Sequence, residues 1–276
     1  MSEVMIRFDE VTFRYSDKKI ILDEVDFTIR KNAKITIMGQ NGAGKSTLFK
    51  LLTGDLKPNS GEIHIERNAK KAIAEQMIPE DKLELTLLDY FKSAFDYEFY
   101  GIEKNIKNVL EVVNLNLPID KQVKDLSGGQ KARLLLAYAL IQEPDILLLD
   151  EPTNNLDEDG IAHLTSFLIM YDKTVIVLSH DTDFLNSFTD GVLNLDVHTH
   201  KIEQFVGDYD NVLDQRERQI ESDRMQNARL EKSIKDRFEK VNRLGGKSVA
   251  MRRLARKTRE DIERDREDIV EMRQED

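Results

Sequence analysis

Alternating hydrophobic and polar residues predict β-strands in the first part of the chain. Residues 4–38 hold two such runs, and the second is followed by the short apolar strand Ile35–Met38. Two later runs, Ile146–Leu149 and Val175–Leu178, are continuously apolar, which is typical of parallel strands buried on both faces. Residues 191–206 have the pattern of a β-hairpin.

Helical spacing of apolar residues separates these strands. It predicts a helix over Lys45–Thr53 that ends at Gly54, and further helix within residues 83–115. Ser127 can cap another helix, Gly129–Gln142. Strands that alternate with helices predict an α/β fold with a mixed sheet core, an antiparallel β subdomain and a helical subdomain.

The pattern changes after residue 208. Residues 209–276 are rich in charge and have only a sparse apolar stripe, which predicts two helices around the break at Gly245-Gly246. We therefore expect two domains, residues 1–208 and a C-terminal helical hairpin over residues 209–276.

Charge is distributed unevenly over the two parts. The chain of 276 residues has a net charge of −11, with 23 Lys/Arg against 35 Asp/Glu in residues 1–208 and 18 against 17 in the rest. This balance argues against non-specific nucleic-acid binding by the whole chain. The chain has no cysteine, which excludes a disulfide framework and fits a cytoplasmic location. Its apolar runs are much shorter than the roughly 20 residues of a membrane span, so no membrane insertion is expected.

A phosphate-binding loop follows the strand Ile35–Met38. The sequence from Gly39 to Ser46 fits G-x-x-x-x-G-K-[ST] between a predicted strand and a predicted helix. Backbone N–H groups and the helix N-terminus would bind phosphate, Lys45 would neutralise the β- and γ-phosphates, and Ser46 would offer its hydroxyl to Mg²⁺. The predicted nucleotide-binding residues here are Gly39, Asn41, Gly42, Gly44, Lys45, Ser46 and Thr47.

Two further motifs follow in order. Asp150 and Glu151 end an apolar strand, where one acid can hold Mg²⁺ and the next can polarise an attacking water. The run LSGGQ, residues 126–130, lies about 20 residues earlier at a helix start, which is a suitable place for an anion.

These three motifs in this order resemble the nucleotide-binding domain of the ATP-binding-cassette (ABC) superfamily. The resemblance covers residues 1–208 and implies ATP and Mg²⁺ as ligands. It implies that Tyr15 stacks on adenine, that Gln76 contacts Mg²⁺ and water, and that His180 touches the γ-phosphate. It also implies a head-to-tail pair of domains, in which Ser127 and Gly129 contact the ATP of the partner. Glu151, His180 and Gln76 are then the candidate catalytic residues, and Ser46, Gln76 and Asp150 the candidate metal ligands.

Residues 151–157, EPTNNLD, and residues 179–185, SHDTDFL, resemble hallmarks of the ABC-F proteins, which act on ribosomes. Asn155 and Thr182 depart from the usual residues of that family. Residues 209–276 resemble its interdomain linker, and residues 240–259 hold eight Lys/Arg and no acid. We expect Lys240 to Arg259 to meet rRNA or tRNA of the ribosome; the alternative is a hairpin that only faces water.

Two other functions remain open. The core motifs also fit the ATPase subunit of a membrane transporter, and, less well, a DNA-maintenance ATPase with a coiled coil. ABC-F proteins normally carry two such domains, so the second domain is expected either in a longer chain or in a second copy of this one.

Overall fold

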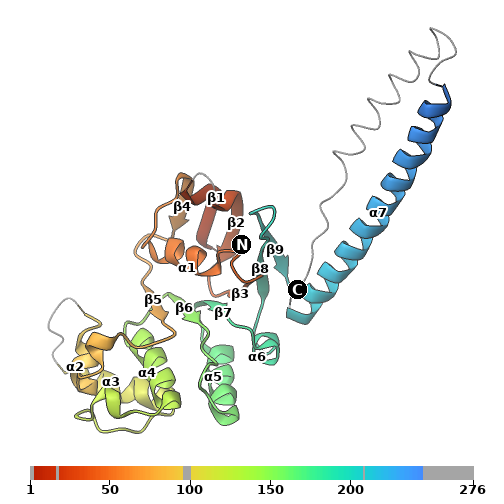
Figure 1. Cartoon of the computed structure of the whole chain (residues 1–276). Helices are drawn as coiled ribbons and strands as arrows, with labels where there is room; N and C mark the ends of the chain where they lie inside the picture. Colours follow the sequence, from red (N-terminus) through yellow and green to blue (C-terminus); the bar gives the residue numbers. More distant parts are fainter. Residues whose placement is uncertain (1–2, 17–18, 96–100, 208, 245–276) are drawn as a thin grey trace. The chain divides into compact units, whose positions relative to one another are not determined.

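The computed structural model describes residues 3–16, 19–95, 101–207 and 209–244. Contacts divide the chain into two units, with the boundary after Val212. The first unit contains two β-sheets and six helices within its described residues (Figure 1).

A six-stranded mixed sheet with the order β5-β6-β7-β3-β8-β9 forms the centre of the first unit. All neighbours pair in parallel except β8 and β9. The predicted strands Ile35–Met38, Ile146–Leu149 and Val175–Leu178 and the hairpin are confirmed. Strand β5 ends at Ala74, so Gln76 lies in the following loop. The strands are β3 (Lys34–Gly39), β5 (Lys71–Ala74), β6 (Ile146–Asp150), β7 (Thr174–Leu178), β8 (Gly191–Leu195) and β9 (Ile202–Val206).

A three-stranded antiparallel sheet with the order β2-β1-β4 lies beside it. Its strands are β1 (Val4–Ser16), β2 (Lys19–Arg30) and β4 (Ser60–Ile65). Gln204 of β9 joins the two sheets, because its side-chain amide donates to the carbonyl of Thr28 at 2.8 Å and accepts from the N–H of Thr28 at 3.3 Å. The side chain of Gln204 thus takes the place of a neighbouring strand.

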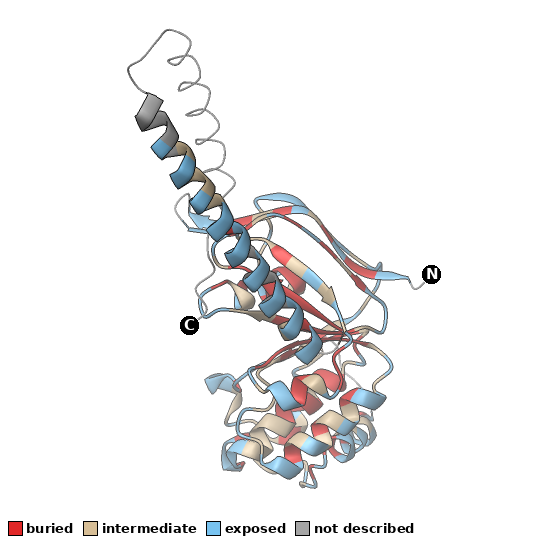
Figure 2. Ribbon diagram, turned by 90° about the vertical axis from the view of Figure 1, so that its right-hand side faces the viewer, coloured by how far each residue is buried: buried red, intermediate tan, exposed pale blue. Residues whose placement is uncertain are grey.

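The inner strands β3, β6, β7 and β8 are buried on both faces, as the continuous apolar runs of β6 and β7 predict (Figure 2). Successive side chains on a strand point to opposite faces. Ile146 and Leu148 of β6 therefore pack with helix α1 (Lys45–Thr53) and the antiparallel sheet. Leu147 and Leu149 pack with the helical layer on the other face. Helix α1 and helix α4 (Gly128–Leu140) consequently belong to opposite faces of the sheet.

The helical layer includes the predicted helical subdomain. Within residues 83–115 the structure has α2 (Leu87–Lys92) and α3 (Ile102–Val112), and Ser127 caps α4 as expected. Helices α5 (Glu158–Met170) and α6 (Thr182–Asn186) complete the layer. In the sequence, α5 is the element after β6 and α6 is the element after β7. Each begins after an aspartate N-cap, Asp157 and Asp181 respectively.

Helix α7 (Tyr209–Leu244) follows β9 and confirms the first predicted helix of the C-terminal part. Its first residues belong to the first unit, where Val212 is buried and Tyr209 packs on the core. The predicted break at Gly245-Gly246 and the second helix of the hairpin lie outside the described residues. No helix in the described part of the chain is long and apolar enough to cross a membrane.

Candidate active site

Four neighbouring parallel strands bring the predicted chemical groups to one edge of the central sheet. The loop after β5 carries Gln76, β6 ends in Asp150-Glu151, and β7 is followed by His180. The phosphate-binding loop follows β3, the next strand in the order. Leu178 pairs with both Asp150 and Ile37, so these strand ends are level. The carboxyl edge of a parallel sheet is where such folds bind ligands.

The phosphate-binding loop is tightly packed against the protein and open at one point. Gly39, Gly42 and Gly44 have φ values of 150°, 85° and 107°. A Cβ atom on Gly39 would lie 2.6 Å from the carbonyl oxygen of Leu195, and one on Gly44 would overlap Ile21. A Cβ atom on Gly42 would have no described atom within 4 Å. The open side of the loop is therefore at Gly42.

Helix α1 begins at the end of this loop. Its first turn holds no acidic residue, and among the described residues no side chain caps it. The N–H groups and the positive end of the helix are thus available to an anion. Ser46 and Asn41 are exposed beside it.

Lys45 is the first residue of α1, and Tyr15 contacts the first turn of this helix. The amine of Lys45 donates to the carbonyls of Gly39 at 2.5 Å and Gln40 at 3.4 Å. Burial lowers the pKa of Lys45, and the charge of Glu151 acts in the opposite direction. The Tyr15 hydroxyl bonds to Oγ1 of the buried Thr47 at 3.1 Å, while its side chain is 53% exposed. Tyr15 is thus held next to the phosphate-binding loop with a ring open to solvent.

Glu151 is held in an uncommon backbone conformation. Its φ is 50°, in the left-handed region, and its N–H donates to the carbonyl of Leu178 at 2.8 Å. Its Oε1 lies 3.3 Å from Nε2 of His180. Burial raises the pKa of the Glu151 carboxyl, and the neighbouring His180 opposes that rise. Backbone strain of this kind is concentrated at functional sites, and a carboxylate with a raised pKa is a better base.

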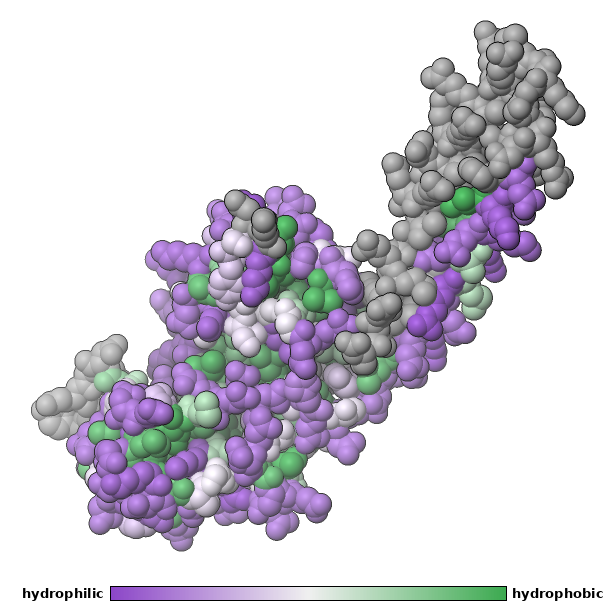
Figure 3. Space-filling view, in the orientation of Figure 1, coloured by the Kyte–Doolittle hydropathy of each residue, from purple (hydrophilic) through white to green (hydrophobic). Residues whose placement is uncertain are grey.

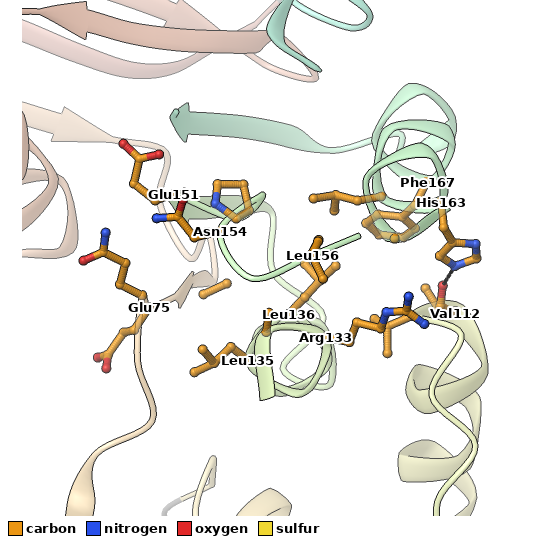
Figure 4. Close-up of a pocket in the computed structure, with 17 residues that line it drawn as sticks. Glu75, Val112, Arg133, Leu135, Leu136, Glu151, Asn154, Leu156, His163 and Phe167 are labelled. Carbon is orange, nitrogen blue, oxygen red and sulfur yellow. Dashed lines mark hydrogen bonds between the residues drawn. The ribbon is translucent and has the colours of Figure 1, made fainter. Parts of the chain in front are cut away.

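Gln76 and Glu151 line the same cleft, which runs between α4 and α5 (Figure 4). Asn154 and Glu75 lie at that end, and the side chains of Leu135, Leu136, Leu156 and Phe167 form apolar walls further in. Burial also raises the pKa of Asp150. The structure therefore brings Gln76, Asp150, Glu151 and His180 together around one sheet edge.

The LSGGQ run does not join this group within the chain. Ser127 is exposed and forms a capping box with Gln130, with hydrogen bonds of 3.3 and 3.0 Å. Gly129 is the second residue of the helix that Ser127 caps. This helix, α4, packs on the face of the sheet opposite to α1. Ser127 and Gly129 therefore lie at the start of a helix on one face of the sheet, whereas the phosphate-binding loop leads into helix α1 on the other face.

The donor set of the sheet edge fits Mg²⁺-ATP. It offers N–H groups and Lys45 for phosphates, and hard oxygen ligands from Ser46, Asp150 and Gln76 for the metal. Two further residues line the cleft. Asn154 belongs to the motif of residues 151–157, whereas Arg133 at the far end was not singled out by the sequence analysis. Arg133 lies only three positions after the LSGGQ run, but nothing in the local pattern distinguishes it from other helix cations.

The sequence and the fold resemble those of known proteins. Residues 22–154 match the family model described as ABC transporter. The structure resembles cbiO1 from Clostridium perfringens, part of the ABC transporter complex cbiONQ, with a TM-score of 0.64, 27% identity, and coverage of 74% of this chain and 89% of that one. The chain therefore has the fold of an ABC-type P-loop NTPase domain. A nucleotide-free ATP-binding cassette from an ABC transporter has the same fold, with a TM-score of 0.65 at 21% identity over 76% of this chain and 95% of that one.

Curated relatives extend the resemblance beyond the ABC domain. The uncharacterized ABC transporter ATP-binding protein YkpA of Bacillus subtilis (strain 168) is 31% identical over 274 residues, covering 87% of this chain and 50% of YkpA. The probable ATP-binding protein YheS of Escherichia coli (strain K12) is 35% identical over 209 residues, covering 75% of this chain and 32% of YheS. The chain thus spans half or less of the length of these relatives.

Proposed function

We propose that this chain binds and hydrolyses ATP as one member of a pair of ABC domains, and that the pair acts on the ribosome in the manner of ABC-F proteins. The proposed ATPase activity rests on one observation. Four adjacent strands end beside each other and are followed by Gln76, Glu151, His180 and the phosphate-binding loop. The ribosomal part rests on the resemblance of residues 151–157 and 179–185 to ABC-F hallmarks and on helix α7.

The proposed hydrolysis uses the residues of the sheet edge. Ser46, Asp150 and Gln76 would hold Mg²⁺, which would neutralise phosphate charge. Glu151 orients the attacking water and takes its proton, since its carboxyl has a raised pKa. The water oxygen bonds to the γ-phosphorus while the bond to the bridging oxygen of ADP breaks. Nε2 of His180 lies 3.3 Å from the carboxylate of Glu151, and His180 would contact the γ-phosphate of bound ATP.

Pairing with a second ABC domain follows from the position of α4. Since α1 and α4 pack on opposite faces of the sheet, Ser127 and Gly129 would complete the site of a partner domain. That partner is either a second domain of a longer chain or a second copy of this one.

The hydrophilic surface of helix α7 suits a polar and charged partner. Its 36 residues would extend roughly 54 Å as a straight helix, and its described surface is mainly hydrophilic (Figure 3). We propose that the basic residues between Lys240 and Arg259, whose side chains lie outside the described residues, contact rRNA or tRNA.

A ribosome co-sedimentation experiment tests this function. The Glu151→Gln protein should sediment with ribosomes when ATP is present and not without it, because it binds ATP but cannot complete hydrolysis. Adding Lys45→Ala should abolish the association, whereas adding Lys50→Ala, an exposed lysine on the same helix, should not. Absence of any ATP-dependent association would rule out the ribosomal role.

The alternative is an ATPase subunit of a membrane transporter. It is favoured by the family description that matches residues 22–154 and by the resemblance to cbiO1. ATP hydrolysis without ribosome association would support this alternative.

A further inference from the structure

Arg133 joins three elements around the LSGGQ helix. It lies in the second turn of α4, and its side chain is 22% exposed. Its Nη1 donates to the carbonyl of Asn114 at 3.0 Å, just beyond the end of α3. Its Nη2 donates to Oδ1 of Asp157 at 3.2 Å, at the start of α5. Figure 4 shows Arg133 beside Val112 of α3, whose carbonyl also bonds His163 of α5 at 2.7 Å.

Asp157 has a second role in this arrangement. The same Oδ1 accepts the N–H of Gly160 at 2.9 Å and so caps helix α5. The Asp157 side chain is 73% exposed, so the ion pair with Arg133 contributes little to stability. Its effect is geometric, because a planar guanidinium fixes two acceptors at once. We call Arg133 with Asn114, Asp157 and Gly160 the Arg133 bridge.

Two glycines allow the segments of the bridge to approach each other. A Cβ atom on Gly160 would lie 2.8 Å from Oδ1 of Asp157 and 3.1 Å from Nη2 of Arg133. A Cβ atom on Gly129 would lie 3.1 Å from the carbonyl oxygen of Asn155. Glycine inside a helix costs stability relative to alanine. The close contact of the LSGGQ turn with residues 152–157 accounts for both glycines.

Residues 152–157 link this contact to the catalytic carboxylate. The loop starts directly after Glu151 and consists of two tight turns. The N–H of Asn154 donates to the carbonyl of Glu151 at 3.2 Å, and the N–H of Leu156 donates to that of Thr153 at 3.1 Å. These two bonds connect Glu151 to the loop and the loop to the residue before Asp157.

We propose that Arg133 is a positioning residue that fixes the LSGGQ turn to the loop after Glu151, so that the two move as one piece. In a pair of ABC domains, the turn would contact the partner's ATP while Glu151 serves the chain's own ATP. The Arg133 bridge would therefore make hydrolysis at one site depend on closure at the other. This inference rests on the proposed function.

Steady-state kinetics of the 276-residue chain test the bridge. Arg133→Met removes both hydrogen bonds and keeps an apolar stem, and misplacement by about 1 Å can cost on the order of 100-fold in rate. We expect kcat to fall at least tenfold, with the affinity for ATP within twofold of wild type. Arg133→Lys should recover part of kcat. Lys131→Met, which changes a neighbouring cation of α4 outside the bridge, should leave kcat unchanged.

Gly160→Ala provides a second variant that keeps every donor and acceptor but separates Arg133 from Asp157. It should also lower kcat. The proposal is overturned if Arg133→Met and Gly160→Ala both retain wild-type kcat, or if Lys131→Met reproduces the loss.

Hydrogen exchange supplies a readout that does not need activity. In Arg133→Met, the amides of residues 127–131 and of residues 154–160 should both exchange faster, while those of β6 remain protected. A change confined to α4 would overturn the bridge. If the wild-type chain hydrolyses no ATP even when paired, the proposed function fails, and the exchange result still decides whether Arg133 joins the two segments.

Discussion

Gly42 and Gly44 of the phosphate-binding loop make a matched pair for one experiment. Both have positive φ, 85° and 107°. Alanine at either position is strained, at a cost of about 1–2 kcal/mol. The positions differ in space, since a Cβ atom on Gly42 would have no described atom within 4 Å, whereas one on Gly44 would overlap Cγ2 of the buried Ile21.

The overlap predicts a difference in stability. Overpacking of a core typically costs about 1–3 kcal/mol, and Ile21 cannot move away easily because it is a buried residue of β2 in the same core cluster as α1. Gly44→Ala should therefore destabilise the ABC domain by about 1–3 kcal/mol more than Gly42→Ala. For a unit of this size, each kcal/mol lowers Tm by about 2–4 °C.

Thermal unfolding without nucleotide, combined with an ATP titration, checks this prediction. Gly42→Ala should lose most ATP affinity at a small cost in Tm, because its methyl group enters the open side of the loop. Gly44→Ala should lose ATP affinity and should also lower Tm by more than Gly42→Ala does. Equal Tm values for the two variants would refute the steric reasoning, and unchanged ATP affinity in Gly42→Ala would refute the assignment of the open side to phosphate.

Four further outcomes are expected. Glu151→Gln should lower ATP turnover by about 10²–10⁴-fold. Burial raises the pKa of the Glu151 carboxyl, so protonation of Glu151 stabilises the folded state fully below the ordinary glutamate pKa, and this stabilisation is lost as pH rises through the raised pKa. Glu151→Gln should thus raise Tm more at pH 8 than at pH 4. An equal gain in Tm at both pH values would contradict this. Tyr15→Ala should weaken ATP binding by the value of a stacked base, about 1–3 kcal/mol, while Tyr15→Phe, which loses only the bond to Thr47, should lose less in the same titration. Gln204→Ala removes both bonds to Thr28 and should lower Tm in calorimetry without changing ATP affinity; an unchanged Tm would show that the link between the sheets is dispensable.

The sequence by itself determined the local elements and most of the candidate site. The Gly39–Ser46 loop, the acids after the apolar strand of β6 and the cap at Ser127 depend on residues near each other in the chain, so pattern and turn chemistry were sufficient. Helices α5 and α6 were not anticipated, although Asp157 and Asp181 are N-cap residues at their starts. Each of these helices has only a few apolar residues at helical spacing, and the continuously apolar strand before it gives a stronger pattern.

Tertiary structure decided which of these elements meet. Strand order depends on pairing between distant segments, and no local period encodes it. Only that order brings Gln76, Glu151 and His180 to the edge that holds the phosphate-binding loop. The packing of α1 and α4 on opposite faces of the sheet separates Ser127 from that loop. Likewise, the role of Arg133 became visible only when α3 and α5 brought an acceptor from each side to its guanidinium, because a side chain's function depends on neighbours that the chain supplies from far away.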